Sequence, residues 1–198
     1  MADIVHLIRH GQSTFNAAWE RDKVDPMILD APLTTLGHDQ AAGLRDTVAQ
    51  LRVDAVIASP LTRALQTASS LSHGLNVPIH VEPLHREYVW SSCDIGRSPI
   101  ALAQEFPHLI FDHLSDPWWW CPSGNPTSVD KEPPEIVMNR VHAFLAALKT
   151  RPEKSVAIVG HCTFFWLFSG IMLQNCEVLT INPHQHIIPE APPPPPGL

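Results

Sequence analysis

Short apolar runs alternate with longer amphipathic stretches along most of the chain. The apolar runs are rich in Val, Ile and Leu and meet polar or turn-forming residues where they end, which predicts buried strands. The longer stretches repeat apolar residues at helical spacing, which predicts helices with one buried face. The predicted strands are residues 3–9, 54–60, 77–82 and 154–161. The predicted helices are residues 32–51, 61–75, 133–150 and 162–173.

This alternation predicts an α/β fold, a three-layer sandwich in which helices flank a mostly parallel central sheet. Ligands in such folds bind outside the carboxyl ends of the strands. Polar or charged residues stand at the ends of three predicted strands. These segments are residues 9–11 (RHG), 59–63 (SPLTR) and 160–161 (GH). We therefore expect these three loops to meet in one cleft.

The rest of the chain departs from this pattern in two places. Residues 83–132 are dense in Pro, Trp, Cys and Gly, and only the segment PIALAQEF looks helical, so we expect an irregular insertion that forms a pocket wall or lid. Residues 184–198 form a proline-rich tail after a single domain of residues 1–183. In this tail we expect His184 and His186 to be solvated rather than to bind a metal, and the proline run to be extended rather than to dock on a partner.

Composition and charge narrow the class of partner. The 198 residues carry a formal net charge of −7 and no run of Lys or Arg, which argues against nucleic acid but leaves room for a small anion held by a few Arg. No secretory signal and no membrane-spanning apolar stretch is evident, and four widely spaced cysteines fit free thiols. These features predict a cytoplasmic protein without a membrane partner; a monomer and a homodimer both stay open.

The RHG loop carries the strongest chemical signal. A neutral imidazole such as His10 attacks an electrophile through one ring nitrogen when the other donates its hydrogen, and the guanidinium of Arg9 matches phosphate oxygens. Arg63 and His161 belong to the other two strand-end loops, and Glu87 opens the irregular segment, where it would supply an acid. A single His at a strand end is usually structural, but this combination predicts phosphoryl transfer.

Five ordered segments carry a family resemblance that spans about residues 4–171. They read LIRHGQSTFN, LTTLGHDQA, SPLTRALQTA, HREY and VAIVGH. Together they resemble the signatures of the histidine phosphatase superfamily, in its phosphoglycerate mutase-like branch, and imply the phosphoglycerate mutase-like fold.

The resemblance also implies roles for individual residues. It implies that His10 is phosphorylated during turnover and that Arg9, Arg63 and His161 form the phosphate pocket. Glu87 would be the proton donor and then the base. Asn16 would contact phosphate. The family uses no metal and no cofactor.

Several assignments are less direct. Gln12 stands where many members carry Glu, which keeps a hydrogen-bonding group near the substrate but removes a charge. Glu82 and Asp94 compete with Glu87 for the role of the acid. Cys162 follows His161, and we expect its backbone N–H rather than its thiol to serve the phosphate.

The tryptophans of the irregular segment either line the pocket or form a local core. These residues are Trp90, Trp118, Trp119 and Trp120, and we expect one of them rather than all four in the pocket.

The resulting functional prediction is a phosphatase that hydrolyses phosphomonoesters of small metabolites through a phosphohistidine at His10. The alternatives are a phosphoglycerate mutase and a non-catalytic phosphate-binding or scaffold protein. The mutases carry a longer insertion after the acid, where this chain reads EYVWSSCDIGRSP, which argues against mutase activity.

Overall fold

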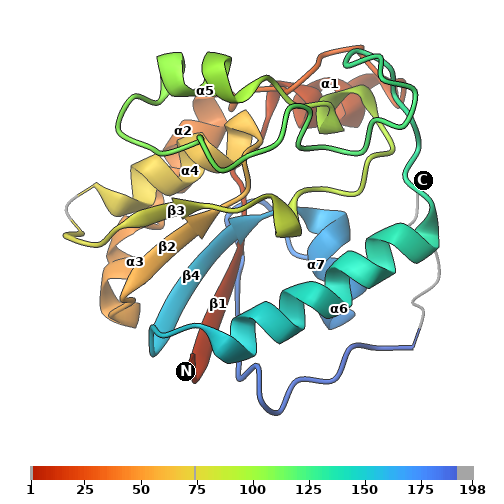
Figure 1. Ribbon diagram of the computed structural model, residues 1–198. Helices are drawn as coiled ribbons and strands as arrows, with labels where there is room; N and C mark the ends of the chain where they lie inside the picture. Colours follow the sequence, from red (N-terminus) through yellow and green to blue (C-terminus); the bar gives the residue numbers. More distant parts are fainter. Residues whose placement is uncertain (1, 74, 191–198) are drawn as a thin grey trace.

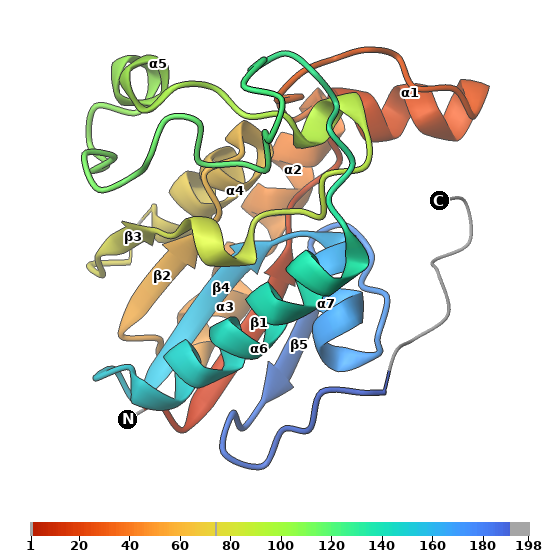
Figure 2. The ribbon, with the colours of Figure 1, turned by 45° about the vertical axis from the view of Figure 1, so that its right-hand side comes forward.

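A five-stranded sheet forms the centre of the computed structural model, which describes residues 2–73 and 75–190 (Figures 1 and 2). Its order is β3-β2-β4-β1-β5, with β1 to β4 parallel and β5 antiparallel to β1. The predicted mostly parallel α/β architecture is therefore confirmed, whereas the edge strand β5 was not predicted. The strands are β1 (Ile4–Arg9), β2 (Ala55–Ala58), β3 (Ile79–Val81), β4 (Ser155–Gly160) and β5 (Val178–Ile181).

Helices cover both faces of this sheet. The α-helices are α1 (Thr14–Asp22), α2 (Thr35–Gly43), α3 (Arg45–Leu51), α4 (Thr62–Ser72), α5 (Pro99–Glu105), α6 (Pro134–Thr150) and α7 (Cys162–Ser169). Two short 3₁₀ turns, η1 (Pro83–His85) and η2 (Ser92–Asp94), lie in the irregular segment.

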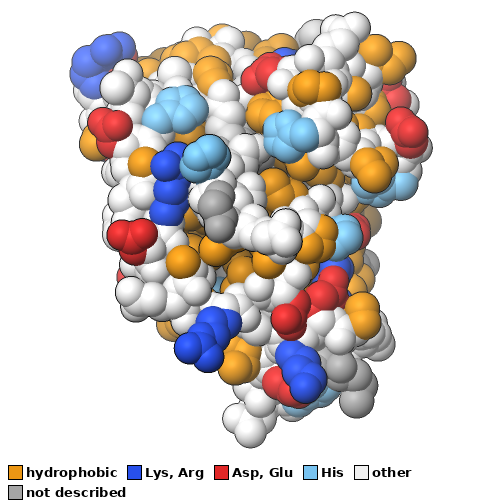
Figure 3. Space-filling model, turned by 90° about the vertical axis from the view of Figure 1, so that its left-hand side faces the viewer, with side chains coloured by type: hydrophobic (Ala, Val, Ile, Leu, Met, Phe, Trp, Pro, Cys, Tyr) orange, Lys and Arg blue, Asp and Glu red, His pale blue; other side chains and the backbone are white. Residues whose placement is uncertain are grey.

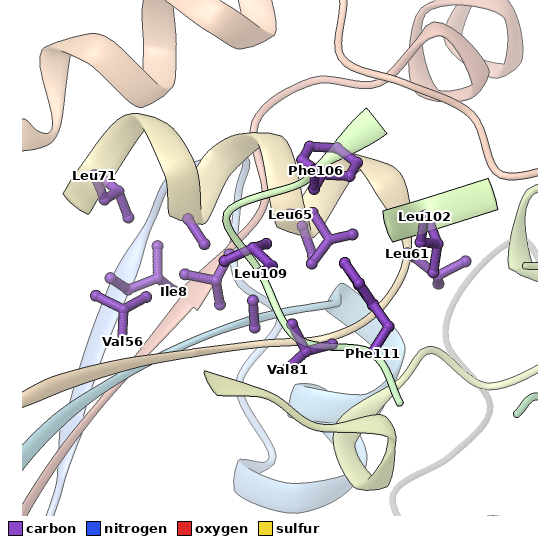
Figure 4. Packing of buried hydrophobic residues seen from close by; sticks show 14 of the residues in the cluster. Ile8, Val56, Leu61, Leu65, Leu71, Val81, Leu102, Phe106, Leu109 and Phe111 are labelled. Carbon is purple, nitrogen blue, oxygen red and sulfur yellow. The ribbon is translucent and has the colours of Figure 1, made fainter. Parts of the chain in front are cut away.

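The side-chain alternation of the strands divides the core into two layers. In β2, Val56 and Ala58 pack on the layer with α3 and α4, and Ala55 and Ile57 pack on the layer with α6 and α7. Figure 4 shows the first layer, where Leu65 and Leu71 of α4 face the strands. Because both faces are covered, the strands consist almost entirely of apolar residues.

Three local features differ from the predicted helices. The predicted helix 32–51 divides at Leu44 into α2 and α3, directly after Gly43, a residue that weakens helices. Leu36, which the periodicity placed on the buried stripe, is 52% exposed. The last predicted helix ends at Ser169 because Gly170 adopts a left-handed conformation (φ 75°).

The helix α1 was not predicted, although its sequence carries a start signal. The Ser13 hydroxyl accepts the Asn16 N–H, and the Asn16 side chain accepts the Ser13 N–H, which forms a capping box.

The irregular segment, residues 83–132, packs over α4 and the adjacent end of the sheet (Figure 1). Its one α-helix is α5, close to the predicted position. Leu102, Phe106 and Phe111 are buried in one cluster with Leu65 of α4 and with Leu61, the residue just before this helix (Figure 4). Part of this segment is therefore core.

The chain beyond β5 returns along α7. His184 is exposed, but the ring of His186 stacks on Phe168 at 4.4 Å between centroids, and its Nε2 lies 2.8 Å from the Phe168 carbonyl oxygen. The prediction that both histidines are solvated is therefore wrong for His186, which caps the exposed end of an aromatic cluster. The proline run at residues 192–196 lies outside the described residues.

Charged side chains are dispersed on the face shown in Figure 3, where Lys and Arg alternate with Asp and Glu and several histidines lie between them. Within residues 2–73 and 75–190, no helix has the length and apolar character needed to cross a membrane.

Two glycines hold the RHG loop against α2. A Cβ atom on Gly37 would lie 2.1 Å from the Gln12 carbonyl oxygen, and a Cβ atom on Gly11 would lie 2.4 Å from the Gly37 carbonyl oxygen. This backbone contact needs glycine on both sides, because the atoms that a side chain would meet belong to main chain and cannot rotate away.

We expect Gly37→Ala to lower the free energy of unfolding by about 1–3 kcal/mol, because the added methyl group overpacks this contact. Gly43→Ala is the matched control in the same helix, since a Cβ atom there meets nothing within 4 Å. In this control we expect the free energy of unfolding to rise by about 0.4–1 kcal/mol, because alanine restricts the unfolded chain more than glycine does. Urea denaturation measures both, and equal effects of the two substitutions would refute the close contact.

Candidate active site

The parallel pairing of β1 with β4 places two histidines side by side. Arg9 is in register with Gly160, so the next residues, His10 and His161, leave the sheet together at its carboxyl end. Their ring centroids are 5.3 Å apart, and both side chains are buried. The loop after β2 adds Arg63 from the first turn of α4. The three strand-end loops therefore meet, as predicted.

Hydrogen bonds fix the tautomer of His10. The Arg63 Nε–H donates to His10 Nε2 at 3.2 Å, and a guanidinium nitrogen only donates, so Nε2 carries the lone pair. The proton is then on Nδ1, which donates to the Gly11 carbonyl oxygen at 2.7 Å. Burial, together with the positive charges of Arg63 and Arg9, holds the pKa of His10 well below its usual value. His10 is therefore a neutral imidazole with an unprotonated Nε2, which accepts the Arg63 Nε–H, and this is the protonation state that a nucleophile needs.

Arg63 is fixed by the opposite wall of the site. Its Nη1 donates to the Cys93 carbonyl oxygen at 2.6 Å, and its Nη2 forms an ion pair with Asp94 at 3.1 Å. The Asp94 side chain also accepts the N–H groups of Trp90 and Ser91, which ties this loop together. The guanidinium is thus held beside His10 in one orientation.

Two further donors point to anion binding. Within the described part of the chain, Arg9 Nε and His161 Nδ1 are buried and have no hydrogen-bond partner. Arg9 is held by its Nη1, which donates to the Leu173 carbonyl oxygen at 2.8 Å, and His161 Nε2 lies 2.7 Å from the Ser59 hydroxyl. Six buried side-chain atoms of the described chain lack a partner, and these two belong to the site. The Arg9 Nε–H is a donor available to a ligand, and His161 Nδ1 is one when it carries a proton.

Glu87 lies at the N-terminus of α7. Its carboxylate oxygens accept the backbone N–H groups of Thr163 at 3.0 Å and of Phe164 and Tyr88 at 2.9 Å. Two N–H groups in the first turn of this helix, those of Thr163 and Phe164, thus bind the acid, and the Cys162 N–H, which we expected to serve the phosphate, is not one of them. They fix the carboxyl group at the mouth of the site.

Glu87 and Asp94 compete for protons. Burial raises the pKa of both carboxyl groups, and the negative charge of Asp94 raises the pKa of Glu87 further. Asp94 has the Arg63 guanidinium as its direct partner, so the charge is better stabilised there. The N–H groups of Tyr88 and Thr163 offset part of this rise at Glu87, and Glu87 remains the member of the pair without a guanidinium partner, so it holds a proton more readily, which is the state that a general acid needs.

These groups open on a cleft of about 490 Å³. Its floor carries His10, Arg9 and Arg63, and its walls come from α1, from residues 87–94 and from the chain after α7. Histidine, two guanidinium groups and a carboxyl group can bind a phosphoryl group, attack it and protonate a leaving oxygen.

Comparison with known proteins decides the family. The model of the histidine phosphatase superfamily (branch 1) matches residues 5–183. The chain belongs to the histidine phosphatase superfamily. It is 31% identical over 214 aligned residues to a phosphoglycerate mutase-like protein of Arabidopsis thaliana, which covers 88% of this chain and 77% of that protein.

Two solved structures share the fold of this superfamily member. The alpha-ribazole phosphatase from Shigella flexneri has a TM-score of 0.63 and 22% identity, covering 90% of each chain. The ecdysone phosphate phosphatase from Bombix mori, solved with tungstate, has a TM-score of 0.63 and 19% identity, covering 97% of this chain and 93% of that one.

The predicted site residues of this superfamily member fall into two groups. Those that line the cleft are Arg9, His10, Asn16, Arg63, Glu87 and Cys162. His161 is fully buried behind His10, and Gln12 is turned away, with its amide oxygen accepting from Thr34 at 2.9 Å. Burial raises the pKa of the Cys162 thiol, which makes it a poor nucleophile.

The structure separates the other candidates as well. Glu82 lines shallow recesses away from the cleft, whereas Asp94 lies in it as the partner of Arg63. Of the four tryptophans, Trp90 lines the cleft, and Trp118 and Trp119 are buried in the core. The helix α1 contributes Trp19, which sequence reasoning missed because it missed the helix.

A buried ion network behind the acid was also missed. Glu132 is 1% exposed and pairs with Arg86 and Arg140, each at 2.8 Å. Arg140 also donates to the carbonyl oxygens of Leu84 at 3.0 Å and Arg86 at 2.9 Å, so α6 holds the backbone that presents Glu87. Glu132 stands directly before two prolines, in the segment KEPPE, where no periodic pattern indicates that it is buried.

Proposed function

We propose that this chain is a phosphomonoesterase that works through a phosphohistidine on His10 and releases inorganic phosphate from small phosphorylated metabolites. The observation that carries the proposal is the tautomer of His10. A buried, neutral ring whose Nε2 electron pair lies beside the Arg63 guanidinium is set up to attack a phosphoryl group.

In the first step, His10 Nε2 attacks phosphorus and the bond from phosphorus to the ester oxygen breaks. Arg9 and Arg63 stabilise the charge on the phosphoryl oxygens, and His161 Nδ1 adds a donor when it carries a proton. The carboxyl proton of Glu87 passes to the departing oxygen, so the alcohol leaves uncharged.

In the second step, water attacks phosphorus and the bond to His10 Nε2 breaks. The Glu87 carboxylate formed in the first step now takes a proton from this water, which restores the acid. The products are inorganic phosphate and free enzyme. Arg63 keeps its position throughout, because Asp94 and the Cys93 carbonyl hold it from behind.

Known relatives agree with hydrolysis. Two proteins with this fold are named as phosphatases, of alpha-ribazole phosphate and of ecdysone phosphate. The relative in Arabidopsis thaliana is named only as phosphoglycerate mutase-like.

We expect His10→Ala to lower kcat/KM for p-nitrophenyl phosphate by at least about 10³-fold, because the covalent step loses its nucleophile. Phosphate release at substrate concentrations well below KM measures the effect. His184→Ala is the control, since His184 is an exposed histidine outside the cleft. A His10→Ala enzyme with the activity of the control would refute the mechanism.

We expect Glu87→Gln to lower kcat/KM for alkyl phosphates by about 10²–10⁴-fold, and kcat/KM for p-nitrophenyl phosphate much less, because kcat/KM reports the steps up to departure of the alcohol and p-nitrophenolate leaves without a proton. The reactive form of Glu87 is protonated and burial raises its pKa, so wild-type kcat/KM for an alkyl phosphate falls as pH rises through that pKa. In Glu87→Gln, kcat/KM for the alkyl phosphate should not fall over this pH range. Glu82→Gln is the control, and an equal loss for both classes of ester in Glu87→Gln would exclude Glu87 as the acid.

A further inference from the structure

We infer that the substrate is the phosphate monoester of an uncharged alcohol with a ring or other bulky apolar part, and that esters of carboxylate-bearing alcohols are disfavoured. This inference rests on the proposed phosphatase function and narrows it to a substrate class. The charges and the aromatic side chains around the cleft carry it.

The cations of the cleft are already committed to the phosphoryl group. Among the described residues, its lining includes two cationic side chains, Arg9 and Arg63, both at the floor beside His10. A phosphate monoester brings a charge of about −1.5 to −2 at neutral pH, which already equals or exceeds what these two guanidinium groups offset, since Arg63 is also paired with Asp94. A second anionic group on the alcohol would enter the cleft without a cation of its own, at the cost of its hydration.

A further cation packs on the wall of the cleft without lining it. The Lys131 ammonium lies 4.0 Å from the centroid of the Trp90 ring, but Lys131 is exposed and does not line the cleft.

The rim of the cleft is acidic instead. Asp25 lines it and accepts the N–H and hydroxyl of Ser92, and these hydrogen bonds hold the pKa of Asp25 below its usual value despite partial burial. Asp25 is therefore ionised at neutral pH. Its charge repels a carboxylate on the departing alcohol and leaves a neutral alcohol unaffected.

Aromatic side chains from two separate elements supply the apolar contacts. Phe15 and Trp19 of α1 stack with their rings 9° from parallel, and Tyr88 and Trp90 come from the loop that carries Glu87. Trp19 and Trp90 are each half-buried, so part of each ring is free to contact a ligand. Walls of this kind bind rings and apolar groups.

A pair of esters that differ only in charge tests the exclusion of carboxylates. We expect kcat/KM for 4-carbamoylbenzyl phosphate to exceed that for 4-carboxybenzyl phosphate by at least about tenfold at low ionic strength. Added salt should reduce this ratio, because it screens the repulsion. Equal values for the two esters, or a preference for 3-phosphoglycerate, would overturn the inference while leaving the phosphatase function in place.

Variants of the aromatic wall test the preference for a bulky group. Trp19→Leu and Trp90→Leu should each lower kcat/KM for benzyl phosphate by about tenfold and change that for ethyl phosphate by less than about twofold. Trp120→Leu is the control, a half-buried tryptophan outside the cleft. If kcat/KM falls equally for benzyl phosphate and ethyl phosphate in the Trp19 and Trp90 variants, the proposed contact between these rings and the substrate is wrong. If the wild-type enzyme releases phosphate from none of these esters nor from p-nitrophenyl phosphate, the proposed function itself fails.

Discussion

The parallel pairing of β1 with β4 is the constraint on which the site depends. Because Arg9 and Gly160 are in register, the chain leaves both strands at the same level and presents His10 and His161 together. The third strand of this set, β2, pairs with β4 and delivers the loop that leads to Arg63. A shift of one residue in either pairing would turn the strand side chains to the other face of the sheet and separate these groups.

Burial then converts this geometry into chemistry. His10 is neutral because a third positive charge beside those of Arg63 and Arg9 would be costly in a buried site. The same burial would leave Arg63 unstable, so Asp94 supplies its countercharge. The charge on Asp94 in turn favours a proton on Glu87. His10, the Arg63–Asp94 pair and Glu87 therefore form one electrostatic unit, in which the charge of each group affects the protonation of the next.

The sequence alone was sufficient to predict those parts of the fold and the site that depend on local residue patterns. The apolar runs predicted four of the strands, and the motifs around His10, Arg63 and His161 predicted which loops meet, since parallel strands share one carboxyl edge. The edge strand β5 and the helix α1 were missed because neither has a strong period.

The polar interactions of the irregular segment could not be predicted at all. Asp94 pairs with Arg63, which lies 31 positions away in the chain, and Glu132 anchors the segment behind Glu87 by pairing with Arg86, which lies 46 positions away. Local sequence pattern does not encode contacts over such separations.

The most direct test of the account is to quench turnover of a substrate in base, which preserves phosphohistidine, and to map the phosphorylated peptide by mass spectrometry. The account predicts one phosphoryl group, on His10. A phosphoryl group on another residue, such as Cys162, or turnover with no covalent intermediate on a rapid-quench time scale, would contradict it.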